Sequence, residues 1–260
     1  MLNWCGYKWE SVMEGGRRIH PGNPWMWYCD DCSWVDSDDV LHLKIEEKPI
    51  EIHHWDGKVY HPTIATGIIR SRRSFSYGTF SADVQLPEGT NLWPSFWTSG
   101  DKSWPPEIDI MEAWSDSHGK YFRWTIPQFP YLVPSWKTTT NIHYNTIVDS
   151  EGSYIDGHYQ KTSIGSRNVP WCKQHNNPSK NFINYKVEWF PDVVRFYANG
   201  KLVREVSGSV PNELTQNNSD PDFRMDVIFN VWCENPDSCN VSMSREMLVK
   251  NFKYTPYAEE

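Results

Sequence analysis

Hydrophobic and polar residues alternate with a period of two over many short stretches of this 260-residue chain. Residues 40–45 and 75–86 show the alternation most clearly, and the second run ends at Pro87. This spacing puts apolar side chains on one face of a β-strand and polar side chains on the other. The remaining expected strands cover residues 64–71, 93–97, 107–112, 185–189, 193–197, 225–232 and 248–254.

Turn-forming residues separate these stretches, and no long segment has the spacing of an amphipathic helix. Asn199 and Gly200 give a strong hairpin signal between two expected strands. Three polar segments are expected to be loops, namely residues 15–24, 161–180 and 211–221. Many short strands with turns between them predict an all-β sandwich, and the chain length fits a single domain over residues 1–260.

The charge balance narrows the classes of partner. The chain has 25 basic and 33 acidic residues and a formal net charge of −8, which argues against a nucleic-acid-binding protein. It has no run of 18 apolar residues, so no membrane-spanning helix is expected. The first residues do not form a basic region followed by an apolar core. Either a secretory leader has been removed or the protein leaves the cell by another route.

The six cysteines leave their pairing open. Cys29 and Cys32 have the spacing of half a zinc knuckle, but no second pair at metal-ligand spacing follows. A disulfide or free thiols are therefore favoured for these two. Cys233 and Cys239 enclose a short polar segment and are suited to a small disulfide loop, which would fit a secreted protein.

The strand expected at residues 107–112 carries three carboxylates among apolar residues. Acids are depleted in strands and are costly to bury unpaired, so this pattern indicates a wet cleft over the acidic face. Glu107 and Asp109 share a face, whereas Glu112 would point to the other face of a regular strand. A β-bulge near residues 110–111 would return Glu112 to the acidic face.

Two carboxylates at a fixed separation are what glycoside hydrolysis requires. Glutamate side chains that lean inward across a concave sheet can approach to about 5 Å, the separation used by a retaining mechanism. Surface acids or a metal site are the alternatives. The high content of tryptophan, 15 residues, favours a carbohydrate, because a flat indole covers the C–H face of a pyranose.

Six segments in the same order resemble motifs of glycoside hydrolase family 16. Residues 107–112 match the bulged signature E-I-D-x-x-E of its laminarinase-like members. The other similar segments are residues 74–80, 93–97, 141–144, 185–192 and 196–200. The resemblance runs from about residue 66 to residue 254. It implies a jelly-roll β-sandwich of two antiparallel sheets with a concave substrate cleft.

The resemblance also implies roles for individual residues. Glu107 would be the nucleophile, and Glu112 the acid that protonates the leaving oxygen and then the base that activates water. Asp109 would hold the geometry and tune Glu107. The candidates for substrate binding are Trp93, Trp97, Trp104, Trp114, His143, Asn230 and Trp232. For each tryptophan a place in the core competes with this role, as does a structural role in the strand for His143.

The implied activity is that of a retaining endo-β-glycanase. Residues 104–106 and 141–144 favour a β-1,3- or mixed-linked β-1,3-1,4-glucan as its substrate. Arg70, Arg72, Arg73 and Arg123 would favour the alternative, an endo-β-1,4-galactanase-type enzyme acting on agar, carrageenan, porphyran or mucin O-glycans, because guanidinium binds sulfate. A non-catalytic glycan-binding module is a further alternative, since fold does not imply function. Transglycosylation by the same covalent intermediate stays open.

The expected partner is a polysaccharide or oligosaccharide, with no nucleic acid and no membrane. We expect a monomer that is secreted, periplasmic or attached to the cell surface. No cofactor and no catalytic metal are expected. A structural calcium ion occurs in parts of the family that the chain resembles, but the sequence does not show a set of ligands for one.

Overall fold

The computed structural model describes residues 1–20, 22–101, 104, 106–115, 122–124, 134–136, 138–148, 154–164, 177–207, 224–234, 236–237, 239, 241 and 245–258. Within them, two large sheets contain most of the strands. The first has eight strands in the order β1 (Leu2–Trp4), β2 (Tyr7–Glu10), β9 (Ile68–Ser71), β20 (Met225–Cys233), β11 (Leu92–Gly100), β12 (Glu107–Glu112), β15 (Thr138–Val148) and β16 (Tyr154–Ile164).

The second sheet has nine strands in its described part. Its path is β19 (Lys201–Ser207), β18 (Val193–Ala198), β17 (Ile183–Trp189), β10 (Gly78–Gln85), β21 (Arg245–Pro256), β5 (Leu41–Glu47), β8 (Ile64–Thr66) and β3 (Met26–Tyr28), with β4 (Ser33–Val35) beside β5. Two small sheets pair β6 (Ile52–His53) with β7 (Val59–Tyr60) and β13 (Phe122–Trp124) with β14 (Pro134–Trp136). The short 3₁₀ turns are η1 (Glu14–Gly16) and η2 (Asp30–Cys32).

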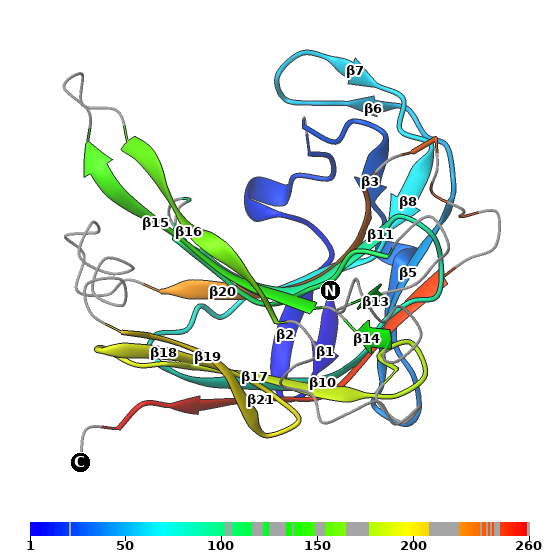
Figure 1. Cartoon of the computed structure of the whole chain (residues 1–260). Helices are drawn as coiled ribbons and strands as arrows, with labels where there is room; N and C mark the ends of the chain where they lie inside the picture. Colours follow the sequence, from blue (N-terminus) through cyan, green and yellow to red (C-terminus); the bar gives the residue numbers. More distant parts are fainter. Residues whose placement is uncertain are drawn as a thin grey trace.

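The two large sheets are stacked as layers. In Figure 1, β11, β15 and β20 curve through the middle of the view, and β10, β17, β18 and β21 lie below them. The curvature makes the upper sheet concave on the side that faces away from the lower sheet. Neighbouring strands are antiparallel except for β3 and β8. This all-β jelly-roll sandwich confirms the predicted fold class.

Aromatic side chains from both layers fill the core between the sheets. Phe96 of β11 and Phe229 of β20 are stacked with ring centroids 4.3 Å apart. Phe252 of β21 meets the ring of Phe229 edge-on at 5.9 Å. Because the side-chain period of a strand is two, these buried rings fix which residues of β11 and β20 point to the opposite, concave face.

Residues 64–71 do not form the single strand that the alternation predicts. The chain changes sheets at Gly67, so that β8 belongs to the second sheet and β9 to the first. A side chain at position 67 would collide with the carbonyl oxygen of Cys32, which explains why glycine occupies the crossing. The alternation of apolar residues cannot reveal this change, because both short strands are largely buried.

The expected loop at residues 161–180 is wrong at its beginning, because β16 continues to Ile164. Residues 165–176, and the expected loop at 211–221, lie outside the described residues. The hairpin at Asn199 and Gly200 is confirmed, since both have positive φ values (47° and 73°) between β18 and β19. No described helix is long and apolar enough to cross a membrane.

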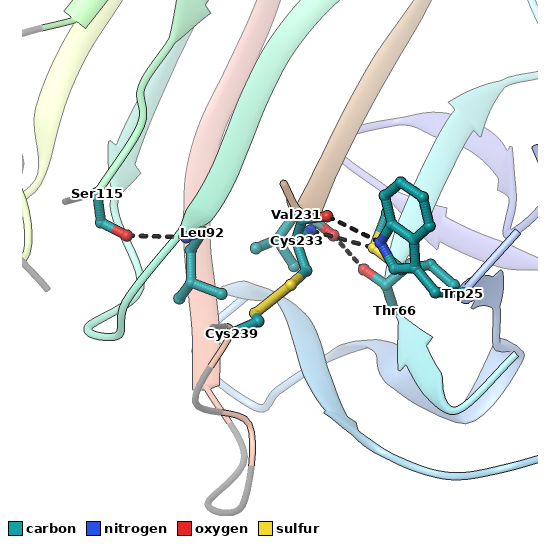
Figure 2. Close-up of a disulfide and its surroundings, with 8 residues drawn as sticks. Trp25, Thr66, Leu92, Ser115, Val231, Cys233 and Cys239 are labelled. Atoms are coloured by element: carbon teal, nitrogen blue, oxygen red, sulfur yellow. Dashed lines mark hydrogen bonds between the residues drawn. A yellow bond between two sulfur atoms is a disulfide. The ribbon is translucent and has the colours of Figure 1, made fainter. Parts of the chain in front are cut away.

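A disulfide joins Cys233, the last residue of β20, to Cys239 and confirms the predicted loop (Figure 2). The indole nitrogen of Trp25 donates a hydrogen bond to the carbonyl oxygen of Cys233 at 3.1 Å, and the Thr66 hydroxyl donates to that of Val231. These contacts fasten the end of β20, a strand that lines the concave face.

The remaining described cysteines, Cys5, Cys29 and Cys32, are free thiols. Burial raises the pKa of Cys5 to about 11. Burial, followed by the neighbouring Cys29, also raises the pKa of Cys32 well above its ordinary value. Cys172 lies outside the described residues.

Candidate active site

Strand β12 contains the β-bulge that the spacing of its acids predicts. Against β11, Phe96 lies opposite Met111 and Trp97 lies opposite Asp109, which leaves Ile110 as the additional residue. The register of β12 against β15 shifts within the same stretch. One extra residue reverses the side-chain alternation beyond it. Glu112 therefore returns to the face that carries Asp109.

The three carboxylates of β12 meet in one cavity. Glu107, Asp109 and Glu112 all line a space of about 110 Å³ on the concave side of the sheet. The rest of its lining comes from β11 and β20, namely Trp93, Ser95, Trp97, Asn230 and Trp232. Two successive strands on one side of β12 thus supply aromatic faces beside the acids.

Indole N–H groups donate hydrogen bonds to Glu112 and to Asn230. Trp93 donates a hydrogen bond from Nε1 to Oε1 of Glu112 at 3.0 Å. Trp97 donates from Nε1 to Oδ1 of Asn230 at 2.7 Å, and Asn230 is almost fully buried. Since an indole can only donate, these bonds fix the orientation of Glu112 and of the Asn230 amide.

Glu107 has polar partners on two sides. Trp104 donates from Nε1 to Oε2 of Glu107 at 2.9 Å. Nε2 of His143 lies 3.3 Å from Oε1 of Glu107 and 3.4 Å from Oδ2 of Asp109. The Asn141 side-chain nitrogen lies 2.9 Å from the same histidine atom. Nε2 of His143 is therefore in contact with both carboxylates and with the Asn141 side chain on β15.

The pKa of Glu107 is raised well above its ordinary value, firstly by burial and secondly by the charge of Asp109. The Trp104 hydrogen bond acts in the opposite direction, because it favours the ionised form. The side-chain hydrogen bond between Glu107 and Asp109 and the charge of Glu112 raise the pKa of Glu107 further.

A second and larger cavity, of about 490 Å³, continues from the first. The two share Trp97, Glu107 and Trp232. The remaining lining residues are Met13, Arg17, His20, Ser99, Gly100, Asp101 and Trp104. Trp104 is half exposed, and its ring centroid lies 5.7 Å from that of His143. The cleft therefore extends from the acids towards the N-terminal part of the chain.

The structure brings together most of the residues singled out from the sequence. Trp93, Trp97, Trp104, Asn230 and Trp232 line the two cavities with the acids. Trp114 lies beside Trp93, with ring centroids 5.2 Å apart, and lines neither cavity. His143 lines neither cavity but contacts two of the acids.

Sequence reasoning missed several lining residues. Ser95 lies between Trp93 and Trp97 on β11, so its place follows from the period of the strand once the acidic face is known. Met13, Arg17 and His20 precede every recognised motif, and only the tertiary fold carries them to the cleft. Nothing in their spacing indicates this position.

Glu107, Asp109 and His143 lie close enough together to hold a metal ion, which was the alternative for the acidic strand. Ligand atoms of Glu107, Asp109 and His143 all lie within 4.8 Å of one another, and among the described residues this is the one such group. Carboxylate and imidazole are suitable ligands for several divalent cations. The Trp104 N–H donates to Oε2 of Glu107 and leaves Oε1, the oxygen next to His143, for a cation.

Three of the four arginines considered for sulfate binding lie away from the two cavities. Arg70 pairs with Asp226 and, at 3.5 Å, with Glu10. The guanidinium of Arg73 lies over the ring of Phe75, 5.5 Å from its centroid. Arg70, Arg72 and Arg73 line neither cavity, and the side chain of Arg123 lies outside the described part of the chain.

The sequence profile of glycosyl hydrolases family 16 matches residues 25–244. Over 185 residues the chain is 26% identical to endo-1,3-1,4-beta-glycanase ExoK of Rhizobium meliloti (strain 1021), covering 68% of this chain and 52% of that protein. It is 28% identical over 163 residues to a beta-glucanase of Rhodothermus marinus, covering 59% of this chain and 46% of that protein. The chain spans about half the length of these curated relatives.

A solved structure shows the same fold. The catalytic domain of an endo-1,3-beta-glucanase (laminarinase) from Thermotoga petrophila RKU-1 superposes with a TM-score of 0.60 at 18% identity. The alignment covers 97% of this chain and 92% of that chain.

Proposed function

Since the chain belongs to glycosyl hydrolases family 16, we propose that it is a retaining endo-β-glycanase that hydrolyses internal β-linkages of a polysaccharide. The observation that carries this proposal is the bulge at Ile110, which aligns Glu107 and Glu112 on one face and in one cavity. Two carboxylates on one strand, surrounded by indole faces, are suited to double displacement on a sugar chain.

In the first step Glu107 attacks the anomeric carbon and forms a covalent glycosyl-enzyme, while Glu112 gives its proton to the departing oxygen. In the second step Glu112 removes a proton from water, which attacks the same carbon and releases Glu107. Trp93 keeps one oxygen of Glu112 in a fixed position, so the other oxygen is available to carry the proton.

Asp109, His143 and Trp104 surround the proposed nucleophile Glu107. A nucleophilic carboxylate has to be ionised, yet burial and the Asp109 charge oppose ionisation of Glu107. The Trp104 N–H acts against both effects, because it stabilises the Glu107 carboxylate. His143, in contact with both acids, fixes their separation.

The proposed substrate is a β-1,3- or mixed-linked β-1,3-1,4-glucan. The two relatives named as an endo-1,3-1,4-beta-glycanase and a beta-glucanase support it. Tryptophans around both cavities match the flat faces of glucose residues. An anionic galactan has less support, because Arg70 and Arg73 are engaged away from the cavities.

We further propose that the protein acts outside the cytoplasm, as a monomer. A polysaccharide is met at or beyond the cell surface, and the Cys233–Cys239 disulfide is of a kind that persists in oxidising compartments.

The test is product release from laminarin, barley mixed-linkage glucan, agarose, carrageenan and mucin O-glycans, with Glu107→Gln as the matched control. We expect oligosaccharides from one or both glucans and none from the variant. Cleavage of a galactan alone would replace the substrate, and binding without cleavage of any polymer would favour a glycan-binding module.

A further inference from the structure

The segment Met13–His20, here called the N-terminal arm, lies outside the part of the chain that the family profile matches. In Figure 1 the dark-blue turn η1 of this arm lies on the open side of the concave sheet. Gly15 and Gly16 both have positive φ values (70° and 77°), which lets the arm reverse direction sharply. The Met13 N–H closes the reversal on the carbonyl oxygen of Arg17 at 3.0 Å.

The arm is fastened at both of its ends. Met13 is 5% exposed and packs in a small apolar cluster with Tyr28, Ile68 and Ile228, against which Trp97 and Trp232 lie. Further along, the side chain of Arg18 forms an ion pair with Asp30 at 2.7 Å. The Tyr28 N–H donates a hydrogen bond to the carbonyl oxygen of Arg18 at 2.8 Å. The two tryptophans that pack on Met13 are the ones that line both cavities, so the arm shares its anchor with the candidate active site.

The arm forms one wall of the larger cavity. Met13, Arg17 and His20 line it together with Trp104 and Glu107. Its volume of about 490 Å³ falls within the range of sites that bind small molecules. The cavity also contains Asp101, which follows the end of β11.

Donors and acceptors of hydrogen bonds both face this cavity. Arg17 supplies a guanidinium, which only donates. Nδ1 of His20 accepts from the Gly22 N–H at 3.1 Å, so in the neutral ring Nε2 carries the proton and donates. Oδ1 of Asp101 is buried and has no hydrogen-bond partner among the described residues. Each hydroxyl of a sugar donates one hydrogen bond and accepts others, which suits a wall of this mixed character.

We propose that the N-terminal arm builds a sugar-binding subsite beside the nucleophile, in which Arg17, His20 and Asp101 bind hydroxyl groups of a neutral hexose residue. The indoles of Trp97, Trp104 and Trp232 cover the faces of that sugar. The inference rests on the proposed function, because it places the sugar next to the one that Glu107 attacks.

The assignment to a neutral sugar follows from the charges in the cavity. Asp101 and Glu107 are two carboxyl groups facing a single arginine. A sulfate or carboxylate substituent on the sugar would gain the attraction of Arg17 but meet repulsion from the acids. A hydroxyl group meets no such repulsion.

The test is calorimetric titration of the inactive Glu112→Gln protein, which keeps the Glu107 carboxyl group in the larger cavity, with laminaritetraose and with a sulfated tetrasaccharide from κ-carrageenan. Arg17→Ala is the test substitution, and Arg18→Ala is its matched control, because Arg18 is the neighbouring arginine and does not line the cavity. We expect Arg17→Ala to weaken laminaritetraose binding about tenfold or more, as for the loss of a charged hydrogen-bond donor. We expect Arg18→Ala to change it by less than about threefold.

Two further variants test the contributions of His20 and Asp101 to binding. His20→Ala should weaken laminaritetraose binding less than Arg17→Ala does, and Asp101→Asn should improve binding of the sulfated tetrasaccharide relative to the parent. Equal losses in Arg17→Ala and Arg18→Ala would overturn the subsite, because they would show that the arm matters only as a support. Tighter binding of the sulfated tetrasaccharide than of laminaritetraose by the parent would overturn the assignment to a neutral sugar. Binding of neither oligosaccharide would overturn the subsite itself.

Hydrolysis by the protein with Glu112 intact is measured in parallel on laminarin and on mixed-linkage glucan. If neither is cleaved while the Arg17 effect on binding is present, the proposed function fails and the subsite stands. If a glucan is cleaved while Arg17→Ala binds like its parent, the proposed function stands and the subsite fails.

Discussion

Strand β12 and the N-terminal arm both contribute to the cleft, but the chain holds them differently. β12 lies between β11 and β15 and pairs with both, so its backbone is fixed on two sides. The arm is attached by a hydrogen bond from Tyr28, a β-bridge between Ile19 and Trp27, the Arg18–Asp30 ion pair and the buried side chains of Met13 and Ile19. Reacting groups need positions accurate to a fraction of an ångström, whereas sugar hydroxyls tolerate more adjustment. The strand is therefore suited to the chemistry and the arm to recognition.

The largest effect should come from deleting single residues of β12. Removing Ile110 takes away the bulge but keeps Glu107 and Glu112 on one face, because the two would then be an even number of residues apart. Removing Ile108 puts Glu107 and Asp109 on opposite faces. Both isoleucines are buried, at 2% and 1% exposed, so the pair is matched in the loss of packing.

We expect the protein without Ile108 to lose activity by a factor of about 10⁴ or more, as for the loss of a catalytic group, and the protein without Ile110 to keep a measurable part of it. The measurement is the rate of glucan hydrolysis per folded molecule, with folding checked by circular dichroism. Equal inactivity of two folded variants would contradict the role given to the bulge.

A smaller effect is expected for Asp109→Asn. The substitution removes a negative charge that raises the pKa of Glu107, so that pKa should fall. The acidic limb of the profile of kcat/KM against pH should then move to lower pH, together with a loss of about 10- to 100-fold in rate. An acidic limb that stays in place would show that another group sets it.

Loosening the arm should affect binding more than chemistry. Met13→Ala removes one of the two buried anchors, and we expect KM for the glucan to rise by roughly three- to tenfold while kcat changes by less than about twofold. Steady-state kinetics gives both values. A fall in kcat at constant KM would mean that the arm positions the reacting groups, which would contradict the difference in role between β12 and the arm.

The smallest effect concerns stability. Because the pKa of Glu107 is raised in the folded protein, its ionisation costs folding free energy as the pH rises from the unfolded value through the folded one. Glu107→Gln removes this cost, so its melting temperature should exceed that of the parent near neutral pH. The difference should shrink towards acidic pH, where Glu107 is protonated in both states. Differential scanning calorimetry at several pH values measures it.

Much of the architecture can be read from the alternation of apolar residues, because most of the strands bury one face. β10 and β17 have alternating burial over their whole length. The bulge could be predicted from the spacing of three acids alone, since their chemistry requires a common face. The Cys233–Cys239 loop followed from sequence proximity.

What the sequence did not reveal depends on distant contacts. β1 and β2 are only three and four residues long, too short for a period to be recognised, yet Trp4 and Trp9 are buried in the core. The cleft position of Arg17 and His20 follows from packing on residues some 50 to over 200 positions away along the chain. The single domain, the roles of the site residues and the expectation of no cofactor stay predictions.

The most direct test of the central claim is to trap the covalent intermediate. A 2-deoxy-2-fluoro glycoside of a glucan oligosaccharide, with a good leaving group, should glycosylate the nucleophile and leave a slowly hydrolysed adduct. Peptide mass mapping should then locate one glycosyl group on Glu107. A label on Glu112, or steady hydrolysis of the reagent with no label on the protein, would contradict the assignment of the two acids.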